Sequence, residues 1–336
     1  MKIYHVLTVF IIILLNSCSP EVPDYYNIRG FAQGTTYSIV YNGGCGIEPA
    51  VMKNNIDSLL LKFDYSLSTY NDKSLISYLN NNLEVVPDSF MIEVFNRAYE
   101  IWKLSDRAFD ITMGPLINAW GFGPDAERRF KPEMLDSLMQ LVGMDKLRLS
   151  DSIIVKSDRN MYLDVNAIAK GYSVDVLCRY LQSRGVERCL AEVGGEVRTI
   201  GSKYPDKPWT VAIDKPIDNN FIPGKQVQAI LRLNNKSLAT SGNYRKFYEV
   251  EGVKYSHTIN PKTGAPVRHN LLSATIITDD CISADAFATA CMVLGLDKSK
   301  KLLARYDFLE AYLIYSDENG EFRTWFTENM VDYLLE

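Results

Sequence analysis

Histidine is scarce in this chain. Only His5, His257 and His269 occur among the 336 residues, and His5 falls in an N-terminal segment treated below. Zinc sites draw many of their ligands from histidine, so this scarcity argues against a histidine-rich zinc site. Any role of histidine in catalysis must fall on very few positions.

Other familiar signatures are also missing. No G-x-G-x-x-G sequence opens a helix after a strand, so a Rossmann-type dinucleotide site is not indicated. There is no dense basic run and the net charge is −5, which argues against nucleic-acid binding. Repeats and low-complexity stretches are absent, whereas 47% hydrophobic and 23% charged residues are typical of a globular protein.

Cysteines with metal-binding or redox spacing are absent as well, since no C-x-x-C occurs. Apart from Cys18, the cysteines are odd in number and mostly lie in apolar segments. We interpret them as packed thiols, with one disulfide possible in an oxidising compartment. They are Cys45, Cys178, Cys189, Cys281 and Cys291.

Residues 1–17 have the pattern of a secretory signal peptide. Lys2 provides the positive start, and the apolar run from Val6 to Leu15 is too short to cross a membrane. The Leu-Asn-Ser-Cys sequence that ends at Cys18 resembles the lipobox of bacterial lipoproteins, in which this cysteine carries the lipid. The alternative is an ordinary signal peptide with an incidental cysteine. We expect an exported protein that is held at a membrane by lipid on Cys18.

The mature chain divides into a short tether and one large domain. Residues 18–28 contain prolines and polar side chains that bury little surface, so we expect a tether there and a folded domain over 29–336. Strand and helix periods are mixed in this domain without a regular βαβ alternation, which favours an α+β fold with mixed, largely antiparallel sheets and packed helices. Helices are expected over 50–63, 87–105, 169–184 and around 282–291. Strands are expected over 35–42, 188–193, 196–201, 209–213, 227–233, 272–278, 308–315 and 321–326, with a hairpin over 246–259.

The segment "ISADAFATAC" (282–291) places a carboxylate and a hydroxyl in an otherwise small and apolar helix. Asp285 and Thr289 are one turn apart on the same face, so they can offer two oxygens to one point in space. A buried charge is costly unless it is paired or binds a metal, and Mg2+ takes oxygen ligands of this kind. On these residues alone, a backbone cap by Asp285 and a backbone hydrogen bond from Thr289 are the simpler explanation.

Two polar segments lie earlier in the chain. In "LSTYNDKSLISYLN" (67–80), hydroxyls and Tyr70 precede a helix start, where free amides can meet a phosphate, although a plain N-cap explains them equally well. In "AFDITMGPLINAWGFG" (108–123), Asp110, glycines and aromatic side chains suit a loop that lines a flat ligand. Aromatic core packing is the competing explanation.

Two later segments carry more chemistry. In "LDVNAIAKGYSVD" (163–175), Asp164 ends an expected strand and Lys170 lies in the first turn of a helix, where positive charge opposes the helix dipole. An anionic ligand explains such a lysine, and a solvated surface lysine is the alternative. His257 ends a hairpin strand before the turn "NPKTG" (260–264), which makes it the best candidate for a general base.

Taken in order, these segments resemble the ApbE family, the FAD:protein FMN transferases. The resemblance runs from Gly34 to about Leu296 and implies an ApbE-like (T-fold-like) α+β architecture. One departure is Gln33, where many members of the family have methionine before the first Gly-Thr. The matching pieces are "GTTYSI", "LSTYNDKSLISYLN", "FDITMGPLINAWGFG", "LDVNAIAKGYSVD", "EVGGEVRTIG", "TSGNYRKF", "YSHTINPKTG" and "SADAFATACMVLG".

The resemblance assigns roles to individual residues. It implies that Asp285 and Thr289 bind Mg2+ together with the backbone carbonyl of Ala167. It implies that His257 activates the hydroxyl of the acceptor and that Lys170 adds positive charge beside the phosphates. The positions that it implies for contacts with FAD are Tyr70, Phe109, Asp110, Ile111, Asp164, Lys170 and His257.

The function implied is Mg2+-dependent transfer of FMN from FAD to a threonine or serine hydroxyl of another protein, with release of AMP. The acceptors implied are subunits of membrane redox complexes, such as the Na+-pumping NADH:quinone oxidoreductase (Nqr) and the related Rnf complex, and the location implied is the periplasmic face of the inner membrane. The alternatives are a Mg2+-dependent FAD pyrophosphatase, in which water replaces the hydroxyl, and a non-catalytic lipoprotein that binds FAD.

Overall fold

The computed structural model of the chain describes residues 24–124, 129–150, 153–203, 205–217, 224–243, 247–250 and 253–335. The expected signal peptide and Cys18 lie outside these residues. In the described part, no helix is both long enough and apolar enough to span a membrane.

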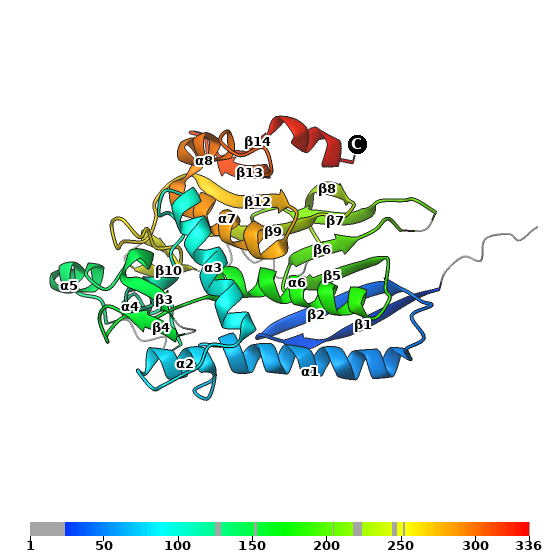
Figure 1. Cartoon of the computed structure of the whole chain (residues 1–336). Helices are drawn as coiled ribbons and strands as arrows, with labels where there is room; N and C mark the ends of the chain where they lie inside the picture. Colours follow the sequence, from blue (N-terminus) through cyan, green and yellow to red (C-terminus); the bar gives the residue numbers. More distant parts are fainter. Residues whose placement is uncertain are drawn as a thin grey trace, which may run out of the picture.

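One eight-stranded sheet forms the centre of the molecule (Figure 1). Its strand order is β1-β2-β5-β6-β9-β12-β13-β14, and every neighbouring pair is antiparallel. Helices separate several of the strands along the chain, so the expected α+β fold with largely antiparallel sheets is confirmed. The strands of this sheet are β1 (Tyr25–Ala32), β2 (Thr35–Asn42), β5 (Cys189–Val193), β6 (Glu196–Ile200), β9 (Ser237–Gly242), β12 (Leu271–Thr278), β13 (Glu310–Ser316) and β14 (Phe322–Phe326).

Three two-stranded sheets complete the strand inventory of the described residues. All three pairs are antiparallel. They are β3 (Leu147–Ser150) with β4 (Ile153–Lys156), β7 (Trp209–Asp214) with β8 (Val227–Leu233), and β10 (Phe247–Val250) with β11 (Val253–Ser256). The last pair is the hairpin expected over 246–259, and its turn at 251–252 lies outside the described residues.

The longer helices gather on one face of the large sheet. α6 packs on β5 and β6, α7 packs on β9 and β12, and α3 lies across both helices (Figure 1). The side chain of Asp88 caps α3 by accepting a hydrogen bond of 2.9 Å from the Met91 amide, as the sequence predicts. The helices are α1 (Pro49–Leu67), α2 (Leu75–Asn80), α3 (Ser89–Leu104), α4 (Gly114–Ala119), α5 (Leu135–Met139), α6 (Asn166–Ser183), α7 (Cys281–Leu294) and α8 (Leu296–Leu303), with 3-10 turns η1 (Ile111–Met113), η2 (Pro132–Met134), η3 (Met144–Lys146) and η4 (Glu328–Tyr333).

The opposite face of the sheet is covered by the β7–β8 hairpin and η4. Val197 of β6 points into this second core, together with Leu231 of β8 and Met330 of η4. Since side chains alternate along a strand, Glu196 and Arg198 of β6 point the other way, toward α6 and α7. The two faces of β6 therefore separate an apolar cluster from the charged groups described below.

Some local expectations need correction. β1 begins at Tyr25 and pairs with β2, so the last four residues of the expected tether 18–28 belong to the sheet. Asp164 does not end a strand, and α6 begins at Asn166, three residues earlier than expected. The reason is local, because the Asp164 side chain accepts a hydrogen bond of 2.8 Å from the Asn166 amide and starts the helix there.

The cysteines of the described residues are free thiols, which agrees with the interpretation as packed thiols. The side chains of Cys178 and Cys189 contact each other across α6 and β5, and both are fully buried.

Candidate active site

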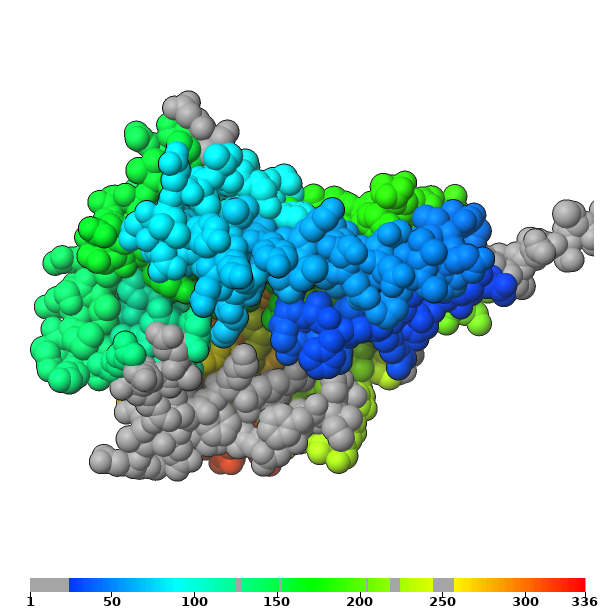
Figure 2. All heavy atoms as spheres, turned by 90° about the horizontal axis from the view of Figure 1, so that it is seen from below, coloured from blue at the N-terminus to red at the C-terminus, as the bar shows by residue number. Residues whose placement is uncertain are grey.

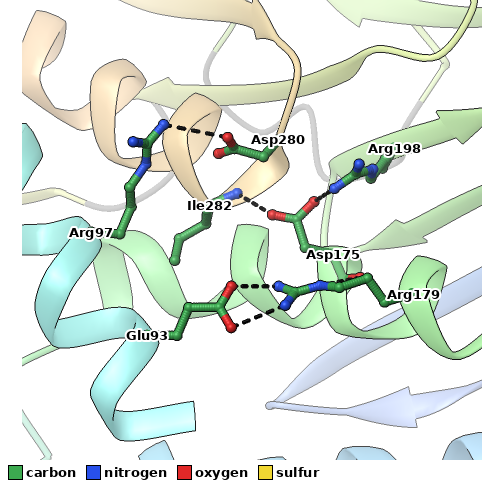
Figure 3. Close-up of a pocket in the computed structure, with 7 residues that line it drawn as sticks. All are labelled: Glu93, Arg97, Asp175, Arg179, Arg198, Asp280 and Ile282. Carbon is green, nitrogen blue, oxygen red and sulfur yellow. Dashed lines mark hydrogen bonds and ion pairs between the residues drawn. The ribbon is translucent and has the colours of Figure 1, made fainter. Parts of the chain in front are cut away.

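α7 is fixed at its N-terminus before it presents any candidate ligand. Asp175 of α6 accepts hydrogen bonds from the amides of Cys281 and Ile282, at 2.9 and 2.8 Å. Arg198 of β6 pairs with the same carboxylate (Figure 3). These contacts satisfy the free amides of the first turn and set the rotation of α7 against α6.

α6 and α7 come into close contact at Gly171. A Cβ atom at this position would lie 2.2 Å from the backbone oxygen of Cys281 and 2.7 Å from the Cβ of Asp285. The Gly171 amide donates a hydrogen bond of 3.0 Å to Oδ2 of Asp285, whose side chain is only 3% exposed. The absence of a side chain at residue 171 therefore allows the Asp285 carboxylate to reach the backbone of α6.

This contact also brings Asp285 next to Ala167. In a regular α-helix the amide of Gly171 lies beside the carbonyl of Ala167, four residues earlier. Because the same amide donates to Asp285, the carboxylate and that carbonyl are neighbours. Oxygen acceptors gathered in this way suit a hard cation such as Mg2+.

Thr289 lies one turn beyond Asp285 on α7, as the sequence predicts, and its side chain is partly exposed. Its hydroxyl lies 3.2 Å from the hydroxyl of Ser241 at the end of β9. The described residues contain no cluster of three or more histidine, cysteine or acidic side chains that could hold a metal. The Mg2+ set implied by the resemblance differs from such a cluster, since it consists of one carboxylate, one hydroxyl and one backbone carbonyl.

Lys170 lies between two buried carboxylates. Its ammonium pairs with Glu196, the first residue of β6, whose side chain is 4% exposed. Burial lowers the pKa of Lys170, but the charges of Glu196 and Asp285 outweigh this and raise the pKa overall. Lys170 therefore stays protonated, and it offsets negative charge at the site.

Glu196 was not singled out from the sequence, although it is buried and pairs with Lys170. Burial raises its pKa to about 7, with Lys170 lowering and Asp285 raising it. Its Oε2 atom is buried without a hydrogen-bond partner, while Oε1 holds Lys170. The sequence does contain a signal for Glu196. It is a charged residue at the start of a strand, two residues before Arg198, and both side chains therefore lie on the face toward α6.

Further polar atoms without partners belong to the segments that were expected to contact the ligand. Nε2 of Gln33 and Oγ1 of Thr69 are both buried and unpaired. Buried polar groups nearly always have a partner, so unpaired ones indicate groups that a ligand or an ion completes. An amide nitrogen and a hydroxyl of this kind can each donate a hydrogen bond to an anionic ligand such as a phosphate.

Asp164 connects α6 to the 108–123 segment. Its amide donates a hydrogen bond of 2.8 Å to the carbonyl of Ile111. Tyr70 lies close enough for the charge of Asp164 to contribute to the upward shift of the tyrosine pKa, which is mainly due to burial. The tyrosine side chain is 63% exposed, so it presents a large free surface for a ring to stack on.

Phe109, Asp110 and Ile111 have mainly structural surroundings. Phe109 and Ile111 are each 2% exposed and belong to the main core. Asp110 caps η1, because its Oδ1 accepts hydrogen bonds from the amide and the hydroxyl of Thr112, at 2.8 and 2.5 Å. Only backbone atoms of this segment remain for direct contact with a ligand at Phe109 and Ile111.

His257 follows β11 and lies against Phe122, with the ring centres 6.4 Å apart in an edge-to-face arrangement. The turn after it is held by Trp120, whose indole N–H donates to the carbonyl of Gly264 at 2.9 Å. The 108–123 segment therefore contacts both the histidine loop and Asp164. The structure brings Asp285, Lys170 and Glu196 together directly, and the 108–123 segment links His257 to Asp164 at the start of α6.

A hollow on one face of the molecule lies beside the candidate site. Figure 2 shows a hollow bordered by the blue atoms of β1 and β2 and by cyan atoms of the next helices, with yellow to orange atoms of the later chain at its floor. A Cβ atom at Gly194 would lie 2.8 Å from Thr35 and 3.3 Å from Lys170, so the β1–β2 turn lies beside the lysine. Gln33 belongs to the same turn.

A separate cavity of about 320 Å³ lies at the N-terminus of α7 (Figure 3). Arg179 pairs with Glu93 at 2.7 Å, Arg97 pairs with Asp280 at 3.3 Å, and Arg198 pairs with Asp175. Because its charges neutralise one another, we interpret this cavity as part of the frame that orients α7. The substrate site is expected on the side of Asp285 and Lys170.

Known proteins resemble this chain over almost its whole length. The model of the ApbE family matches residues 33–313. The FAD:protein FMN transferase of Vibrio cholerae is 33% identical over 315 residues, which cover 92% of this chain and 92% of that protein. The FAD:protein FMN transferase of Escherichia coli is also 33% identical, over 317 residues that cover 92% of this chain and 89% of that protein.

Solved structures agree. The flavin transferase ApbE from Vibrio cholerae superposes with a TM-score of 0.83 at 31% identity, covering 93% of this chain and all of that one, 100%. The apo form of the flavinyl transferase ApbE from Pseudomonas stutzeri gives a TM-score of 0.82 at 31% identity, covering 92% and 96% of the two chains.

Proposed function

This chain belongs to the ApbE family and is an FAD:protein FMN transferase, and we propose that its transfer of FMN to a threonine or serine hydroxyl depends on Mg2+ held by Asp285, Thr289 and the Ala167 carbonyl. The observation that carries this proposal is the buried Asp285 carboxylate beside the first turns of α6. A carboxylate so placed needs a cation, and Lys170 is already engaged by Glu196.

Different residues are proposed to hold the metal and to contact the phosphates. Asp285 supplies the negative charge that attracts a divalent cation, while Thr289 and the Ala167 carbonyl supply neutral oxygens. A Mg2+ ion held by these oxygens would supply Lewis-acid chemistry and would offset negative charge on the pyrophosphate. Lys170 keeps its proton and places a fixed positive charge on the same side.

His257 acts on the other reactant. The acceptor oxygen forms a bond to the phosphorus of the FMN half of FAD, and the bond from that phosphorus to the bridging oxygen breaks. AMP leaves with the bridging oxygen, and the proton of the hydroxyl passes to His257. A serine or threonine hydroxyl is a weak nucleophile near neutral pH, so a base within hydrogen-bond reach is needed.

The proposed setting is a membrane surface. Lipid on Cys18 would hold the exported domain at the periplasmic face of the inner membrane. The proposed acceptors are subunits of membrane redox complexes of the Nqr or Rnf type. Support comes from the sequence pattern of residues 1–18, which has the charge, length and cysteine of a lipoprotein leader.

The test is incubation of the protein with FAD, Mg2+ and a purified Rnf-type acceptor domain, followed by intact mass measurement of the acceptor. We expect a gain equal to one FMN, release of AMP, and loss of both on chelation of the metal or in Asp285→Ala. Appearance of free FMN without a mass gain would identify an FAD pyrophosphatase. Binding of FAD with neither product would identify a carrier.

A further inference from the structure

A second cavity, of about 290 Å³, lies where α8 meets the end of α7. Four cationic side chains line it, namely Lys262, Lys298, Lys301 and Arg305, and Val293 and Leu302 belong to its apolar lining. We call this cavity and its cations the basic groove. Lys298 and Lys301 are three residues apart on α8, so they project from the same face of the helix.

The charge of the basic groove is unusual for this protein, whose net charge is −5. Within the described residues, no carboxylate pairs with Lys262, Lys298 or Lys301, and all three are exposed. Arg305 pairs with Asp106 at 3.0 Å, and Asp106 is the one acidic residue of the lining. A concave surface with excess charge of one sign attracts a partner of the opposite sign.

The basic groove borders segments that belong to the candidate active site. Asn260, in its lining, follows His257 by three residues, and Ala108 directly precedes Phe109. Val293 lies one turn beyond Thr289 on the same face of α7. A chain bound in the groove therefore lies close to the loop that carries the proposed base.

We propose that the basic groove docks an acidic segment of the acceptor protein and so delivers the acceptor hydroxyl to His257. This inference rests on the proposed function, because it assigns a binding surface to the protein that receives FMN. The cations give the segment its charge preference, and the apolar floor receives the side chains between its carboxylates. α8 lies on the opposite side of the molecule from α1 (Figure 1), and Lys298 and Lys301 on α8 are exposed.

The test uses the double variant Lys298→Glu with Lys301→Glu in the full chain. Lys203→Glu with Lys207→Glu is the matched control, because both lysines are exposed between β6 and β7 and lie outside the groove. For each protein, kcat/KM for the acceptor domain and KM for FAD are measured at low and high salt. Binding of a fluorescein-labelled ten-residue glutamate peptide is measured by anisotropy.

We expect the groove variant to lose about ten-fold or more of kcat/KM for the acceptor at low salt, with KM for FAD unchanged. It should also lose peptide binding, whereas the control keeps both. If wild type binds the peptide through the groove but never labels an acceptor, the proposed function fails and the groove stands as an acidic-peptide site. Equal losses in both variants, or none, overturn the docking proposal. Loss of binding to phosphatidylglycerol vesicles with full transfer activity would assign the groove to a lipid surface instead.

Discussion

Glu196 offers an oxygen to Lys170 and keeps a second oxygen unpaired in a buried position. When both are ionised, Glu196 and Asp285 bring two negative charges to the site against the one positive charge of Lys170, which favours a divalent cation. Glu196→Gln removes one of these charges while keeping the shape of the side chain. We expect affinity for Mg2+, measured by calorimetry without substrate, to fall by roughly ten-fold, as is typical when a group beside metal ligands is changed.

Two further variants separate charge from packing at Glu196. Glu196→Asp keeps the charge and should recover part of the Mg2+ affinity. Glu187→Gln, at an exposed position just before β5, should leave the affinity unchanged. If Glu196→Gln binds Mg2+ as wild type does, the carboxylate serves only to hold Lys170.

His257 is proposed as the base for the acceptor hydroxyl and is one of several positions implied for contact with FAD, so its removal should largely spare the binding of FAD. His257→Ala should lower the rate of acceptor labelling by about 100- to 10,000-fold, the usual contribution of a general base. FAD affinity is measured by flavin fluorescence beside the rate of mass gain. Unchanged labelling would make His257 a structural partner of Phe122, and lost FAD binding would move it into the flavin pocket.

The positions of candidate site residues were predictable from the sequence where their spacing alone places them on one face of a helix. The four-residue interval between Asp285 and Thr289 fixes their common side on a helix. Lys170 stood out because it was expected in the first turn of a helix, but α6 begins at Asn166 and Lys170 lies in its second turn. Glu196 was not predicted as a site residue because a carboxylate at the start of a strand is usually solvated. Only the packing of α6 against β6 shows that this one is buried.

At the scale of elements, the crossing of α6 and α7 depends on Gly171. Replacing glycine by alanine inside a helix normally stabilises the helix by roughly 0.5–1 kcal/mol. Here the added Cβ would meet the backbone of Cys281 at 2.2 Å, so the helices must separate. We expect Gly171→Ala to destabilise the protein by about 1–3 kcal/mol and to weaken Mg2+ binding, since Asp285 moves away.

Thermal unfolding followed by circular dichroism checks this prediction, together with Mg2+ titration of the folded variant. Ser183→Ala, at the exposed last residue of α6, is the control for helix propensity. An increase in the melting temperature of Gly171→Ala would show that the helices can adjust without loss, contrary to the expected clash.

Most of the long elements were predictable from period and turn residues, whereas β3, β4, α4, α5 and α8 were missed. The strands β9 and β1 were also missed, and these two share a physical cause. β9 has the sequence "SLATSG", buried on both sides over its first half, so it shows no alternation. β1 is an edge strand of mixed exposure, and its first residues directly follow the proline-containing stretch that was expected to be a tether. In both cases the neighbouring strands, and not the local sequence, determine the structure.

At the scale of the whole molecule, the proposed membrane attachment depends on one thiol. Cys18→Ser should give an exported protein that leaves the membrane fraction, because the proposed lipid chains supply the affinity for the membrane. Fractionation followed by a salt wash and immunoblotting measures this. Retention of the variant on membranes after the wash would contradict the lipoprotein assignment.

The hydrogen bond from Gly171 to Asp285 joins residues that are 114 positions apart. Synthesis from the N-terminus therefore completes α6 long before the segment of α7 that carries Asp285. Contacts of such high sequence separation form late in folding, because the loop between them must close first. The proposed binding of Mg2+ would thus report the last stage of folding, and a chain cut before residue 281 lacks the Asp285 carboxylate whatever the metal concentration around it.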